Sequence, residues 1–84
     1  MEFFFAIHEN KCMELKDRLK NIGINIKSER LRCGISQEFL AEKCGISRNS
    51  ISLIETGKIN PTITRVIDIA KILKVDINLL LKDA

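Results

Sequence analysis

Aromatic residues are scarce in this chain of 84 residues, which has no Trp, no Tyr and only four Phe. Proteins that bind single-stranded nucleic acid stack successive bases on aromatic side chains, so the composition argues against that class. A strongly basic tract is also missing, and the formal net charge is only +3. This balance permits binding to nucleic acid without demanding it.

The sequence offers little that could support catalysis or bind a metal. Cys12, Cys33 and Cys44 are odd in number and lack Cys-x-x-Cys or Cys/His spacing, so we interpret them as small apolar side chains in a reducing compartment rather than as disulfide or zinc cysteines. There is no pairing of a nucleophile with a base and no glycine-rich phosphate loop. We therefore expect no catalytic residues, no metal site and no cofactor, and the chain is not predicted to be an enzyme.

Long hydrophobic runs are absent. The N-terminal stretch MEFFFAIHENK contains a five-residue apolar run with Glu2 ahead of it, whereas a signal peptide has a positive leader and a membrane span needs about 20 apolar residues. We expect a cytoplasmic protein with no membrane partner. Residues 1–12 are predicted to be an apolar extension whose phenylalanines could enlarge a dimer or fold back onto the first helix. Alternatively, Met13 is the working start.

Residues 13–84 are predicted to form one all-helical domain with a modest core. A chain of this length is too small to hold an effector-binding domain as well. A first helix is expected over about residues 13–32, where Gly23 could cause a kink or a frayed turn. Its apolar stripe and that of a fourth helix show helical spacing: Leu15, Leu19, Ile22, Ile26 and Leu31; Ile63, Val66, Ile67, Ala70 and Leu73.

Capping residues delimit the other helices. Ser36 and Ser47 are expected to cap the second and third helices, Thr62 the fourth and Asp76 the fifth. Pro61, the one proline, is poorly suited to any helix interior. The fold class predicted is therefore an all-α bundle of five helices.

Residues 37–56, QEFLAEKCGISRNSISLIET, have the pattern of two short helices that cross through a tight turn. The positions expected to face inward are Leu40, Ala41, Cys44, Ile46, Ile51 and Ile54. Gly45 would occupy the corner, where a left-handed backbone makes a Cβ costly. The third helix is left with an outward polar face, so the pattern predicts a helix-turn-helix.

Three motifs extend this pattern in order: SQEFLAEKCGIS, RNSISLIETGKINP and IDIAKILKVDINLLL. Through them, residues 22–81 resemble the phage repressor and Cro type of helix-turn-helix, the Xre-like family. The resemblance spans roughly three quarters of the chain and leaves out the segment before about Met13. It implies a five-helix repressor-like DNA-binding bundle and a sequence-specific transcriptional regulator without a ligand-sensing domain of its own.

The outward face supplies candidates for base contacts. Arg48 stands at the start of the third helix, and a guanidinium can bond guanine O6 and N7 together, while Asn49 can match adenine N6 and N7. Ser52 could contact a base edge or a phosphate, and Leu53 could pack on a thymine methyl group. The alternative is that these side chains are only solvated surface.

The remaining site residues come mainly from the resemblance. It implies that Gln37 reaches a phosphate, helped by the N-terminus of its helix. The other phosphate candidates are Ser47, Lys58 and Asn60. Arg30 and Glu55 match positions that form a buried ion pair in the family, which is a structural role.

A dimer is expected because one recognition helix covers few base pairs. The resemblance implies a dimer surface on the fifth helix, with apolar candidates Ile77, Leu79, Leu80 and Leu81. Ile69 and Ile72 lie off the main apolar stripe of the fourth helix, so they could belong to the same dimer surface. The operator would then be a pseudo-palindrome with half-site centres about 34 Å apart.

Two alternatives concern partners. The same fold could serve as a protein-interaction module or antitoxin, in which case Arg48 and Asn49 would not matter for DNA binding. Glu38 and Glu42, four residues apart, could contact RNA polymerase, although surface solvation is the favoured explanation.

Overall fold

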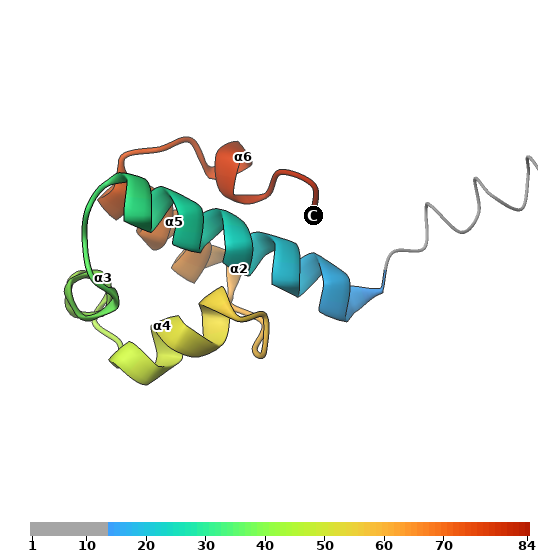
Figure 1. Cartoon of the computed structure of the whole chain (residues 1–84), viewed down its shortest axis with the longest axis horizontal. Coiled ribbons are helices and arrows are strands. Elements are labelled where there is room, and N and C mark those ends of the chain that lie inside the picture. The colour runs from blue at the N-terminus through green and yellow to red at the C-terminus, as the bar shows by residue number, and fades with distance from the viewer. Residues whose placement is uncertain (1–13) are drawn as a thin grey trace, which may run out of the picture.

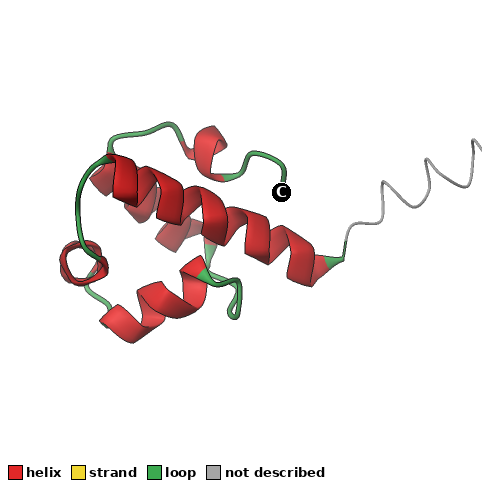
Figure 2. Cartoon of the chain, viewed as in Figure 1, coloured by secondary structure: helices red, strands yellow, loops and turns green. Residues whose placement is uncertain are grey.

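The computed structural model describes residues 14–84 and consists there of five helices without strands (Figures 1 and 2). The helices are α2 (Leu15–Arg32), α3 (Gln37–Cys44), α4 (Arg48–Glu55), α5 (Ile63–Leu73) and α6 (Ile77–Leu80). The predicted all-α, five-helix fold is confirmed. The predictions for the apolar N-terminal extension, Cys12 and the start at Met13 lie outside the described residues.

Local hydrogen bonds explain where the helices begin. The predicted caps Ser36 and Thr62 accept bonds from backbone N–H groups three residues ahead, at 3.0 and 3.2 Å. Ser47 does the same at 3.1 Å, and a carboxylate oxygen of Asp76 accepts from a backbone N–H two residues ahead at 2.8 Å. A side-chain cap of this kind stabilises a helix by about 1 kcal/mol. All four predicted caps are confirmed.

The core lies where α2, α3, α4 and α5 face one another, and α6 closes one side (Figure 1). Its completely buried large side chains come from all five helices: Ile26, Leu40, Ile51, Ile69 and Leu80. Each such side chain stabilises the fold by about 1.5–3 kcal/mol. The prediction of Ile26, Leu40 and Ile51 as inward residues is confirmed.

The buried face of α5 is rotated from the predicted one. Val66, Ala70 and Leu73 are buried as expected, but Ile69 is fully buried, whereas Ile63 is 59% exposed and Ile67 lies at the surface. Both sets have helical spacing and share the same central residues. Which flank is covered depends on the neighbouring helices, so the sequence pattern could not choose between them.

The first-helix stripe was also only partly right. Leu19 and Ile22 are half-buried, but Leu15 and Leu31 are exposed. Leu31 is five positions from Ile26, so it projects about 140° away from the core-facing side. A stripe with a five-residue step therefore cannot remain on one face of the helix.

Gly23 does not break α2, which is continuous from Leu15 to Arg32. Instead, Gly23 is buried where α2 presses against the end of α4. A Cβ on this residue would lie 2.5 Å from the carbonyl oxygens of both Ile54 and Glu55. Only hydrogen fits there, so the glycine allows a close helix crossing rather than a kink.

The prediction that Leu80 forms part of a dimer surface on α6 is wrong. Its side chain is completely buried within the single chain, so it cannot be an exposed part of a dimer surface. Ile77, Leu79 and Leu81 are half-exposed. Separately, none of the described helices is long and apolar enough to cross a membrane.

Candidate nucleic-acid interface

α3 and α4 form the two-helix unit that the sequence predicted. Gly45 ends α3 with φ 73° and ψ 30°, in the left-handed region where a Cβ is strained. The next backbone N–H, of Ile46, donates to the Ala41 carbonyl at 3.0 Å and closes the turn. Ala41 is buried where the helices cross, and Ile54 helps to hold α4 against the body. The corner and its small residue are confirmed.

The exposed side of α4 presents polar side chains to solvent. Arg48 and Asn49 are exposed in the first turn of α4, and Ser52 and Leu53 are half-exposed. A hollow of about 240 Å³ is lined by Gln37, Arg48, Asn49 and Ser52. The fold therefore brings the candidate anchor on α3 together with three of the four candidate base readers on α4.

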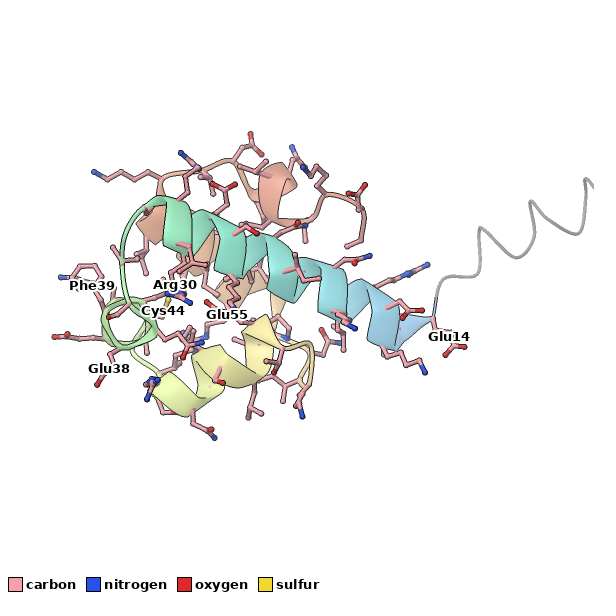
Figure 3. The ribbon with its side chains drawn as sticks, in the orientation of Figure 1. Glu14, Arg30, Glu38, Phe39, Cys44 and Glu55 are labelled. Atoms are coloured by element: carbon pink, nitrogen blue, oxygen red, sulfur yellow. The ribbon has the colours of Figure 1, made fainter. Side chains whose placement is uncertain are left out.

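A buried ion pair connects α2 to the end of α4. Arg30 Nε lies 2.7 Å and Nη2 3.1 Å from the two carboxylate oxygens of Glu55, and the side chains are 8% and 1% exposed. Arg30 Nη1 also donates to the Ile35 carbonyl at 2.8 Å. Figure 3 shows Arg30 and Glu55 between the two helices. The expected pair is present, with the two-pronged geometry that favours Arg over Lys.

Gln37 has a second role that the sequence did not indicate. Its Nε2 donates to Glu55 Oε1 at 3.0 Å, so the amide joins the buried ion pair. The amide oxygen and the second N–H remain for a ligand in the hollow. Gln37 thus links the orientation of the candidate interface to the core, whereas the sequence predicts only a phosphate anchor at the surface.

The other phosphate candidates are placed less uniformly. The Ser47 hydroxyl is engaged in capping α4 and shares a hydrogen bond with the Ser50 hydroxyl at 3.0 Å. Lys58 and Asn60 are exposed in the loop after α4. The backbone N–H of Lys58 donates to the Leu53 carbonyl at 2.9 Å, which fixes the start of that loop.

Arg65 is a positioning residue that sequence reasoning missed. From α5, its Nη1 donates to the Cys44 carbonyl at 2.7 Å, at the last residue of α3. A cation at a helix C-terminus is favourable because of the helix dipole. Burial raises the pKa of the Cys44 thiol, the nearby Arg65 opposes this shift, and Asp68 adds to it. The contact depends on packing between α3 and α5, so no local sequence signal could have revealed it.

The acidic pair on α3 lies on the surface. Glu38 and Glu42 are both exposed. Beside them, the Lys43 ammonium group lies 5.3 Å from the centre of the Phe39 ring. Figure 3 shows Glu38 and Phe39 pointing outward from α3.

Within residues 14–84, the five helices, the left-handed glycine corner and the exposed polar side of α4 define a domain built around a helix-turn-helix. The helix-turn-helix family model matches residues 26–80. The chain belongs to this family, in its phage repressor and Cro type, whose members are transcriptional regulators and not enzymes. The resemblance predicted from the three sequence motifs is confirmed.

Individual relatives agree with this assignment. An uncharacterized helix-turn-helix transcriptional regulator of Archaeoglobus fulgidus is 38% identical over 47 residues, which cover 56% of this chain and 67% of the relative. The structure of the restriction-modification controller protein C.AhdI from Aeromonas hydrophila is similar with a TM-score of 0.76 and 25% identity, over 81% of this chain and 99% of that one. A hypothetical transcription factor from Neisseria, NHTF, gives a TM-score of 0.73 and 29% identity, over 82% and 79% of the two chains.

Proposed function

We propose that the chain is a sequence-specific regulator of transcription that binds double-stranded DNA as a dimer on a pseudo-palindromic operator. The observation that carries this proposal is the hollow shared by Gln37, Arg48, Asn49 and Ser52 at the start of α4. No hydrogen bond or ion pair within residues 14–84 occupies the side chain of Arg48 or Asn49. Their donors and acceptors are therefore available to base edges.

The bases read would follow from these side chains. Arg48 would bond a guanine through O6 and N7, and Asn49 an adenine through N6 and N7. Ser52, one turn further along α4, would contact a base edge or a phosphate. Leu53 is half-exposed and would pack on a thymine methyl group.

Phosphate contacts would set the register of α4 in the groove. Gln37, held by Glu55, would bind a phosphate together with the N-terminus of α3. Lys58 and Asn60 would contact the strand after α4. Ser47 would contribute only through the spare capacity of its capping hydroxyl.

The dimer would form through α6. Leu79 is the best candidate because it is half-exposed and is not among the side chains packed against the core, unlike Ile77 and Leu81. The two α4 helices would then enter successive major grooves about 34 Å apart. A contact of Glu38 and Glu42 with RNA polymerase stays a prediction.

Selection of bound duplexes from a random DNA pool tests the proposal. We expect an enriched sequence with twofold symmetry and a preference for guanine and adenine at adjacent positions. Failure to enrich any duplex would refute the proposed function and favour a protein-interaction module. An enriched sequence without symmetry would refute only the dimer.

The variant Arg48→Ala tests the base contact. It should weaken binding to the selected sequence by about 1–3 kcal/mol and remove the preference at one base position. Arg32→Ala is a matched control, because Arg32 pairs with Glu29 at 2.6 Å on the surface of α2 and lines neither hollow. An equal loss with Arg48→Ala on every sequence would make Arg48 a phosphate contact instead.

A further inference from the structure

A second hollow lies beside the end of α4, and none of its lining residues lines the first hollow. It measures about 390 Å³ and is lined by Lys16, Asp17, Lys20, Thr56 and Gly57. The first three residues come from the N-terminal half of α2, and the last two follow α4 directly. The family match begins only at residue 26, so this half of α2 is a feature outside it.

Two glycines fix the hollow rigidly relative to α4. Gly23 lets the α2 backbone approach the carbonyl groups at the end of α4, as described above. Gly57, at φ 74°, lies so close to α2 that a Cβ would be 2.7 Å from Lys20 Cα and 2.9 Å from its nitrogen. The close packing of α2 against the end of α4 therefore fixes the positions of Lys16 and Lys20 relative to α4.

The size of α4 places this hollow near a DNA strand. α4 has eight residues, which corresponds to about 12 Å at 1.5 Å per residue. The major groove of B-DNA is about 12 Å wide. If Arg48 and Asn49 lie over the bases, the C-terminal end of α4 lies close to the phosphates that border the groove. Lys58, next to Gly57, extends the same region.

The charges suit a phosphodiester group. Lys16 and Lys20 are four positions apart on one side of an exposed helix, and the 3.9 Å contact of Lys16 with Glu14 is too exposed to hold it strongly. The Thr56 hydroxyl donates back to the Ser52 carbonyl at 2.8 Å, so it satisfies the helix end. Asp17 is the one group in the hollow that would repel an anion.

We propose that Lys16 and Lys20 bind a backbone phosphate of the DNA flanking the bases that α4 reads. This inference rests on the proposed function and extends its footprint beyond the family segment. The contact would raise affinity on every sequence equally, because a phosphate carries no base identity.

Charge variants provide the test. With the selected duplex, Lys16→Gln combined with Lys20→Gln should lower the slope of log affinity against log salt by about one unit per half-site, because the two lysines share one phosphate. Raising the salt from 50 to 200 mM should therefore weaken binding of the double variant about threefold less per half-site than it weakens binding of the wild type. Asp17→Asn should act in the opposite direction and tighten binding. Lys71→Gln, which removes one positive charge from the exposed face of α5, should leave the slope nearly unchanged.

A neutral phosphate locates the contact. Methylphosphonate placed at single positions of the flanking strand should weaken binding of the wild type at one position per half-site and have no effect there on the double lysine variant. Base preference should be the same in both proteins. A salt slope unchanged in the double variant, or equal sensitivity of both proteins at every position, would overturn the inference while the proposed function stands. A wild type that binds no duplex would overturn both.

Discussion

The buried ion pair gives the most quantitative prediction. The Glu55 carboxylate accepts three charged or polar hydrogen bonds, two from Arg30 and one from Gln37. Arg30→Met removes the two strongest and leaves a carboxylate that is 1% exposed without its counter-charge. Breaking a buried pair from one side costs about 3–5 kcal/mol. A chain of this length is stable by only about 4–13 kcal/mol, so the variant should lose a large share of its stability.

Urea unfolding followed by circular dichroism measures this loss. Arg30→Met and Glu55→Leu should each lower the free energy of unfolding by about 3–5 kcal/mol, and the double variant should lose much less than the sum. The reason is that an apolar pair of similar volume leaves no buried charge. Arg32→Met is the matched control, because Arg32 is 64% exposed, so its pair with Glu29 is open to solvent on the Arg32 side, and solvent-exposed pairs contribute about 0–1 kcal/mol.

Two results would refute this reasoning. If either single variant lost less than about 1 kcal/mol, the pair would not carry the buried charge as the geometry indicates. If the two losses simply added, Arg30 and Glu55 would act independently despite their 2.7 Å contact.

Other predictions concern packing, assembly and a thiol. Gly23→Ala should lower the free energy of unfolding by about 1–3 kcal/mol, because the clash with two fixed carbonyl oxygens outweighs the helix propensity gained; Ser28→Ala, on an exposed part of the same helix, should not destabilise. Leu79→Asp should give a folded monomer in analytical ultracentrifugation, and a surviving dimer would move the interface elsewhere; Leu80→Asp should instead unfold the chain, because Leu80 is fully buried. Because burial raises the pKa of Cys44, its alkylation, followed by mass spectrometry, should require more alkaline pH than that of an unfolded peptide, and equal rates would contradict this.

Much of the interface was predictable because its signals are local. The caps Ser36 and Ser47 act on N–H groups three residues away, and the corner glycine depends on its own φ angle. These signals set the ends and direction of α3 and α4, and so the exposed position of Arg48. By contrast, the hydrogen bond from the Gln37 side chain goes to Glu55, which is 18 residues away.

The sequence by itself determined five helices, their boundaries and the helix-turn-helix, because capping and helical periodicity operate within a few residues. Only the tertiary structure decided which flank of α5 is covered, that Leu80 belongs to the core, and that Gly23 permits contact rather than a kink. It also brought Lys16 and Lys20 beside the end of α4, from a segment more than thirty positions earlier in the chain. These outcomes depend on which surfaces meet when the helices pack, and no single helix carries that information.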